Sequence, residues 1–93
     1  MPYPLHQTGK VHAQATSNDF ELTYKNNKGV LIAPGTANGE ITLKMFSYPG
    51  GGEDGDTFIV SWDSNDKPFI IPIRIKAVAG NWSGADSFLT ELL

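Results

Sequence analysis

The chain has 93 residues, which is the size of one domain and excludes a two-domain enzyme with a separate cofactor lobe. Seven basic and ten acidic residues give a net charge of -3, the wrong sign for a surface that binds nucleic-acid phosphates. The chain has no cysteine, so a disulfide framework, a thiolate zinc site and a thiol nucleophile are excluded. Ten glycines and six prolines favour turns over helices.

The amino-terminal residues 1–9 hold two prolines and show no apolar periodicity. Proline restricts the backbone to extended conformations, so we expect an extended arm outside the core. This segment lacks the basic and apolar regions of a signal peptide. The longest apolar stretch, near Phe69 to Ile75, is interrupted by Pro72 and Arg74. The sequence therefore predicts neither secretion nor a membrane span.

Short runs of alternating apolar and polar residues, separated by clusters of Gly, Pro, Asn and Asp, predict antiparallel strands in the first half of the chain. We expect a weak strand over 10–15 and a clear one over 19–25. Turn residues at 26–29 then lead into 30–33, where all four residues are apolar. A strand of this kind is typically buried on both faces.

The second half of the chain continues the alternation. Strands are predicted over 41–46 and 58–62, on either side of a glycine-rich acidic loop at 49–56. The longest alternating run covers 69–78 and contains Pro72. Because proline cannot donate a ladder hydrogen bond, we expect Pro72 in an edge strand or at a bulge.

The carboxyl-terminal segment changes its period. Ser83 to Asp86 has the S-x-x-D spacing of a helix cap, and apolar residues follow at helical spacing. This pattern favours a short terminal helix or tail whose apolar stripe docks on another surface, because so short a helix is marginal alone. The stripe consists of Phe88, Leu89, Leu92 and Leu93.

These segments together predict an all-β fold, an antiparallel β-sandwich or small barrel of about six or seven strands. The expected units are the arm at 1–9, a single β domain at 10–80 and the tail or short helix at 81–93. The residues expected to be most buried are Phe20, Leu22, Leu31, Ile41, Leu43, Phe58, Val60, Trp62, Phe69, Ile71 and Ile73.

The acidic loop is the one candidate metal site. Glu53, Asp54 and Asp56 lie among glycines, and calcium takes about six to eight oxygens from carboxylates and backbone carbonyls. The spacing matches no EF-hand, and the loop lacks the lysine and hydroxyl of a phosphate-binding loop. We favour a solvated loop and expect no cofactor, with calcium as the alternative.

The two histidines, His6 and His12, are the candidate general bases. No nucleophile elbow or triad motif accompanies them, although catalysis needs a nucleophile and an orienting acid beside the base. A chain of this length also leaves little room for a deep cleft. We therefore expect no enzymatic activity.

Aromatic residues support a glycan-binding alternative. Trp62 continues the apolar face of its strand and is expected in the core, whereas Tyr48 and Trp82 are left free by the strand pattern. Several β-sandwich modules bind glycans through flat aromatic faces beside an acidic loop. Tyr48 and Trp82 are thus candidate sugar-stacking residues, with calcium as a structural ion.

Both ends of the chain favour contacts with other subunits. The arm and the apolar tail lose entropy when they become ordered, and burial against a neighbouring subunit offsets that loss. The candidate partner-binding residues are Pro2, Tyr3, Pro4 and Leu5 in the arm and Phe88, Leu89, Leu92 and Leu93 in the tail.

With this arm, its turn-punctuated strands and this tail, the whole chain resembles the small, cysteine-free, all-β accessory proteins of tailed bacteriophage virions. These are head-decoration proteins and head-tail or tail components. The resemblance implies a non-enzymatic structural subunit of a virion, assembled in the host cytoplasm. It also implies a homo-oligomer that binds a protein lattice, such as a major capsid or tail protein. From the net charge and the lack of a long apolar stretch we expect neither nucleic acid nor membrane as a partner.

Overall fold

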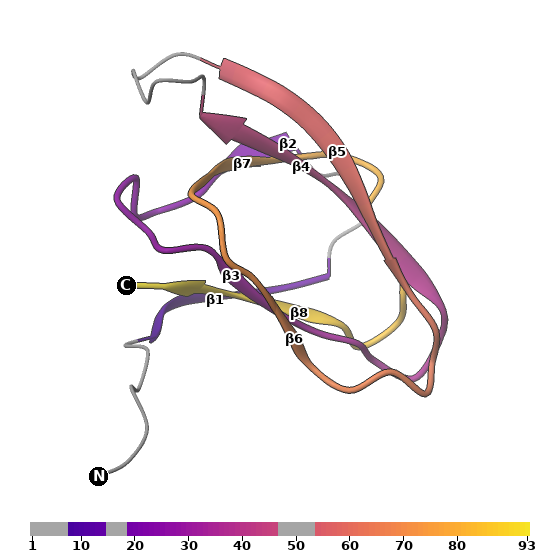
Figure 1. Ribbon diagram of the computed structural model, residues 1–93. Coiled ribbons are helices and arrows are strands. Elements are labelled where there is room, and N and C mark those ends of the chain that lie inside the picture. The colour runs from indigo at the N-terminus through magenta and orange to yellow at the C-terminus, as the bar shows by residue number, and fades with distance from the viewer. Residues whose placement is uncertain (1–7, 15–18, 47–53) are drawn as a thin grey trace, which may run out of the picture.

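A computed structural model describes residues 8–14, 19–46 and 54–93 (Figure 1). Within these ranges the chain forms strands and no helix, hence no helix that could cross a membrane. The strands are β1 (Thr8–Ala13), β2 (Asp19–Glu21), β3 (Val30–Ala33), β4 (Gly39–Phe46), β5 (Asp54–Trp62), β6 (Phe69–Ile71), β7 (Ile75–Ala79) and β8 (Phe88–Leu92).

The described strands form two four-stranded antiparallel sheets (Figure 1). Sheet A has the order β1-β8-β3-β6, and sheet B has the order β2-β7-β4-β5. This is the strand order of a jelly roll, in which two Greek keys make two facing sheets. The prediction of an all-β antiparallel sandwich is confirmed. The described strands number eight rather than six or seven, and their two separate sheets form a sandwich rather than a barrel.

The core lies between the two sheets. Of the residues expected there, Leu22, Ile41, Leu43 and Trp62 are buried. The apolar side chains enclosed most fully come from both sheets: Val30, Ile32 and Leu89 from sheet A, and Ile41, Leu43, Ile75 and Val78 from sheet B.

Seven of the predicted core residues are less buried than expected. Ile73 is 40% exposed, because it lies between β6 and β7 and belongs to neither strand. Leu31 is half-buried, because its neighbours Val30 and Ile32 occupy the inner face of β3. The others lie on sheet edges and pack against the core only in part: Phe20 on β2, Phe58 and Val60 on β5, and Phe69 and Ile71 on β6.

The long strand predicted over 69–78 is two strands in different sheets. β6 ends at Ile71 in sheet A, and β7 begins at Ile75 in sheet B. Pro72 lies directly after the edge strand β6 rather than in a strand or at a bulge, so its missing N–H interrupts no ladder. In the crossing, the guanidinium of Arg74 lies 3.9 Å from the centroid of the Phe46 ring.

The predicted carboxyl-terminal helix is wrong, because residues 88–92 form β8, an inner strand of sheet A. β8 pairs with β1 on one side and with β3 on the other. Backbone hydrogen bonds to a strand on each side outweigh the helical preference of so short a segment. The domain therefore extends beyond residue 80 to include this strand.

The segment between β2 and β3 is fixed by Asn27, which is buried. Its side-chain Nδ2 donates to the carbonyl oxygens of Tyr24 and Ile75, at 2.6 and 2.8 Å. Its Oδ1 accepts from the backbone amides of Gly29 and Ile75, at 3.1 and 3.0 Å. One asparagine thus joins this turn to β7, and the predicted turn at 26–29 is held by side-chain bonds as well as by backbone conformation.

Candidate interaction surface

The outer face of sheet A carries a row of mostly apolar side chains across its four strands, with Thr90 as the member from β8. Val11 of β1 lies opposite Thr90 of β8, Thr90 opposite Leu31 of β3, and Leu31 opposite Ile70 of β6. Residues directly opposite each other in an antiparallel pair point to the same face. We call the following set the sheet A face: Val11, Ala13, Leu31, Ala33, Ile70, Phe88 and Thr90.

The sheet A face contains no charged residue, and Thr90 is its one polar member. Val11 is 53% exposed, Ile70 42% and Phe88 44%, so large apolar side chains meet solvent at three places on it. The solvated face of an antiparallel sheet is normally polar. A contiguous exposed apolar face marks a contact site for another protein or a membrane.

The structure separates the predicted tail residues into two groups. Phe88 lies on the sheet A face and is exposed, which suits a contact residue. Leu89 and Leu92 of the same strand are buried, so the prediction that they bind a partner is wrong, because the fold covers their side chains. Leu93 is half-buried. The arm residues Pro2, Tyr3, Pro4 and Leu5 lie outside the described residues.

Sequence reasoning missed Val11, Leu31 and Ile70 as surface residues. A signal was present in β3, where four consecutive apolar residues indicate a strand covered on both faces. The inner face is covered by sheet B, whereas the outer face is partly exposed. Val11 and Ile70 could not be found without the strand order, because they come from β1 and β6, at opposite edges of the sheet.

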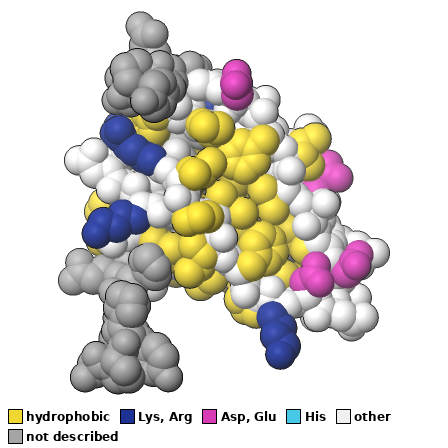
Figure 2. Space-filling model, in the orientation of Figure 1, with side chains coloured by type: hydrophobic (Ala, Val, Ile, Leu, Met, Phe, Trp, Pro, Cys, Tyr) yellow, Lys and Arg dark blue, Asp and Glu magenta, His cyan; other side chains and the backbone are white. Residues whose placement is uncertain are grey.

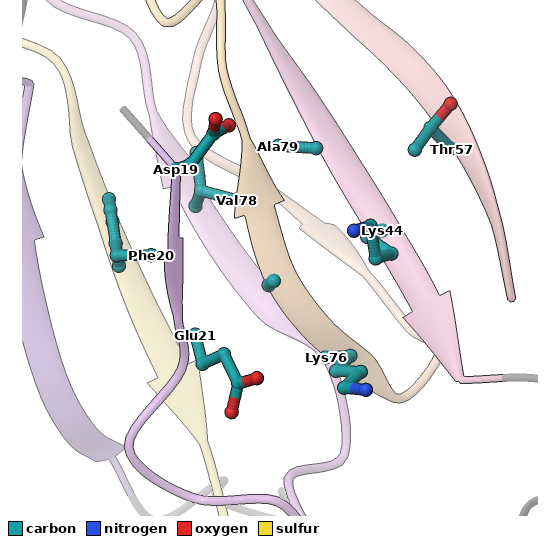
Figure 3. A pocket seen from close by; sticks show the side chains of 9 residues that line it. Asp19, Phe20, Glu21, Lys44, Thr57, Lys76, Val78 and Ala79 are labelled. Carbon is teal, nitrogen blue, oxygen red and sulfur yellow. The ribbon is translucent and has the colours of Figure 1, made fainter. Parts of the chain in front are cut away.

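A polar groove of about 470 Å³ crosses the outer face of sheet B (Figure 3). Asp19 and Glu21 of β2 stand on one side, and Lys44 of β4 and Thr57 of β5 on the other. In Figure 3, Phe20 points away from these side chains. The bottom of the groove is formed by small side chains of β7. Ala77 pairs with Glu21 of β2 on one side and with Lys44 of β4 on the other. The groove is thus lined by carboxylate, ammonium and hydroxyl groups.

The predicted sugar-stacking role of Trp82 is contradicted by its position. Trp82 is only 3% exposed, and its Nε1 donates to Oγ of Ser87 at 3.0 Å. Its ring packs beside Phe20, with 6.4 Å between the ring centroids. A buried indole cannot stack on a sugar. Tyr48, the other candidate, lies outside the described residues.

The predicted calcium alternative is only partly covered by the structure. Asp56 is an exposed residue of β5, and Asp54 begins that strand, while Glu53 lies outside the described residues. Among the described residues, no group of three or more His, Asp or Glu side chains is placed to hold a metal ion. The described part of the loop therefore supplies no argument for calcium.

Of the two candidate bases, His6 lies outside the described residues, and His12 contacts a buried carboxylate. His12 Nε2 lies 2.6 Å from Oε2 of Glu91. The backbone amides of Thr23 and Tyr24 donate to the same carboxylate, at 2.9 and 2.7 Å. Glu91 lies between members of the apolar stripe, in the segment that was expected to be a tail or short helix, so sequence reasoning missed it. With three donors on one enclosed carboxylate, the arrangement is suited to anchoring β8.

Comparison with known proteins adds no family to this description: no family model, curated protein or solved structure matches the chain significantly. The function is therefore inferred from the fold and from the chemistry of the surface. The two surfaces that stand out are the sheet A face, which is apolar and exposed, and the groove of sheet B, which is polar.

Proposed function

We propose that the protein is a non-enzymatic structural subunit that binds a larger protein lattice through the sheet A face. The observation that carries this proposal is the mostly apolar row from Val11 to Ile70, in which Val11 and Ile70 are exposed and Leu31 is half-buried, with the exposed Phe88 beside it. Burying such a face removes apolar surface from water, and each square ångström buried contributes roughly 25 cal/mol. A second protein that covers this face is favoured by the same effect that forms the core.

The kind of partner follows from the chemistry of the face. Flat apolar faces without charges are typical of permanent subunit contacts, which are more apolar than transient ones. A membrane surface would instead favour basic residues around the apolar side chains, and the chain is acidic overall. We therefore propose a protein partner held in a lasting assembly.

We further propose that this assembly is a virion, with the protein acting as a capsid decoration subunit or a head-tail or tail component. The jelly-roll order supports the proposal by analogy, because capsid domains commonly use it. The same fold also serves lectins, so the fold alone does not select the function. The apolar sheet A face favours a structural role over sugar binding, because a sugar site needs polar side chains.

Particle sedimentation tests this proposal. The protein, recovered from its natural source, is expected to sediment with large nuclease-resistant particles. A double variant, Ile70→Thr with Phe88→Thr, alters two exposed positions and keeps strand-forming side chains, so it is expected to fold but to stay in the unassembled fraction. Ile73→Thr changes an equally exposed residue outside the face and serves as the matched control. Normal assembly of the double variant, or absence of the protein from any particle, would refute the proposal.

The groove of sheet B favours glycan binding as a second candidate function. Asp19 and Thr57 are exposed polar residues on its two sides, and such groups hydrogen-bond the hydroxyls of a sugar. A glycan array would test this function. Saccharide binding that is lost in Asp19→Asn and Thr57→Val, but kept in Asp66→Asn on an exposed turn, would support it. No binding at millimolar saccharide would exclude it.

A further inference from the structure

The side of the sandwich where β5 and β6 lie is open in two ways. β5 is the edge strand of sheet B and β6 is the edge strand of sheet A, and the chain passes from one to the other (Figure 1). Among the described strands each has one paired neighbour, so its other backbone edge is left unpaired by the strands at 8–14, 19–46 and 54–93. Figure 2 shows hydrophobic side chains gathered on this side of the molecule.

The core is incompletely covered between these two edges. Phe58 and Val60 of β5 pack against the core cluster but are only partly buried, and so are Phe69 and Ile71 of β6. These side chains point inward, toward the facing sheet, so they belong to the core rather than to the sheet A face. Another strand added beside β5 would extend the core over them.

β5 lacks protection along its centre. Natural edge strands are usually short or carry charges, prolines or bulges, which prevent pairing with another chain. β5 has nine residues, and its central stretch from Thr57 to Ser61 contains no charge and no proline. That stretch pairs with β4 without a bulge, since the register shift lies nearer Asp54. Ile59, at the middle, is 63% exposed.

We propose that β5 pairs antiparallel with β5 of a second copy of this chain, with Ile59 of the two copies opposite each other. This contact goes beyond the proposed function, because it lies on a different side of the molecule from the sheet A face. It joins the two B sheets into one continuous sheet twice as wide. A symmetric pair of identical strands of this kind forms a closed dimer.

The register follows from the charges and from the two faces of the strand. Centring the pair on Ile59 places Phe58 opposite Val60 of the partner subunit, so inward apolar side chains meet across the contact. Asp56 then lies opposite Trp62 of the partner subunit, so the acidic residues of the two copies are not directly opposed. The sequence of β5 is thus complementary to itself, which favours a second copy over an unrelated strand.

Cysteine cross-linking tests this contact, because the chain contains no cysteine of its own. Cα atoms directly opposite in an antiparallel pair are about 4.5 to 5.5 Å apart, within the range of a disulfide. Ile59→Cys is expected to form a covalent dimer under mild oxidation. Thr57→Cys and Ser61→Cys should cross-link mainly when they are mixed, because this register places each opposite the other. Ile70→Cys, on the edge strand of the other sheet, is the control.

Charge exchange at the same position gives a second, independent measurement. Ile59→Lys and Ile59→Glu place like charges opposite each other, so each variant should sediment at half the mass of the wild-type dimer. An equimolar mixture should recover the dimer. Thermal unfolding of each variant checks that it is folded.

The pairing would be overturned by a wild-type chain that is monomeric, or by an equimolar mixture of Ile59→Lys and Ile59→Glu that stays monomeric. Cross-linking of Ile70→Cys in place of Ile59→Cys would also overturn it. So would pairing of β5 only with a strand from a different protein. The particle experiment on the sheet A face does not depend on residue 59. Failure of the dimer and failure of the structural role are therefore distinguishable.

Discussion

His12 of β1 and Glu91 of β8 are joined by a contact of 2.6 Å between Nε2 and Oε2, inside the fold. The Glu91 side chain is fully buried, and its two remaining donors are backbone amides of the segment that follows β2. The carboxylate therefore connects sheet A to the chain leaving sheet B. Because a buried charge is tolerated only when it is paired and hydrogen-bonded, all three contacts are expected to matter for stability.

Replacing Glu91 with glutamine should destabilise the fold. Glutamine has an NH₂ group in place of one carboxylate oxygen, and this group cannot accept a hydrogen bond from the donors around Glu91. We expect a loss of about 2 to 3 kcal/mol in the free energy of unfolding. Urea denaturation followed by tryptophan fluorescence measures it. Glu40→Gln, at an exposed position, is the matched control and should change little. Equal urea midpoints for the two variants would show that the buried carboxylate contributes no stability.

Replacing Asn27 with aspartate should also destabilise the fold. A carboxylate cannot donate to the carbonyl oxygens of Tyr24 and Ile75, and it would face both of them as a buried negative charge. We expect a loss of about 2 to 4 kcal/mol in the free energy of unfolding, measured by urea denaturation. Asn65→Asp, in an exposed turn, makes the same chemical change without those partners. If both variants unfold alike, the four bonds of Asn27 are energetically unimportant.

Trp82→Ala should remove one of the largest core side chains and leave a cavity. The expected cost is about 3 to 5 kcal/mol, seen as a lower midpoint of thermal unfolding. Trp82→Phe keeps most of the apolar volume and loses the bond to Ser87, so it should fall between the wild type and the alanine variant. An alanine variant as stable as the wild type would contradict the buried position of this indole.

Gly29→Ala should be more damaging than Gly80→Ala. Both glycines have positive φ angles, 119° and 106°, so alanine is strained at either position. A Cβ at position 29 would also lie 2.1 Å from the carbonyl oxygen of Ile71, whereas at position 80 its nearest contact is 3.3 Å away. We expect Gly80→Ala to cost about 1 to 2 kcal/mol in denaturant unfolding, and Gly29→Ala clearly more. The reverse order would contradict the close approach of this turn to Ile71.

Local pattern sufficed for the all-β class and for most strands. The alternation in β4 and β5 and the apolar run of β3 identify these strands without reference to the rest of the chain. Trp62 was also assigned correctly to the core, because it continues the inward face of β5. In each case the side-chain period of a strand is a property of neighbouring residues, so sequence alone carries it.

Tertiary pairing decided the elements where local patterns were ambiguous. Residues 88–92 have helical spacing, yet they form β8 because β1 and β3 supply ladders on both sides. The alternation from Phe69 to Ile75 is continuous, yet the chain leaves sheet A after Ile71 and enters sheet B. Neither outcome can be found locally, because the deciding hydrogen bonds connect residues far apart in the sequence.

The candidate surfaces were decided by the strand order as well. Val11, Leu31 and Ile70 are far apart in the chain. Only the spatial order of the strands in sheet A, β1-β8-β3-β6, brings them into a row. The contact between His12 and Glu91 could not be predicted either, because the two residues lie at opposite ends of the chain and Glu91 stands among apolar residues. The sequence by itself determined which residues alternate within a strand. Which faces are covered and which remain open depends on long-range pairing, because a face is buried only when another sheet lies across it.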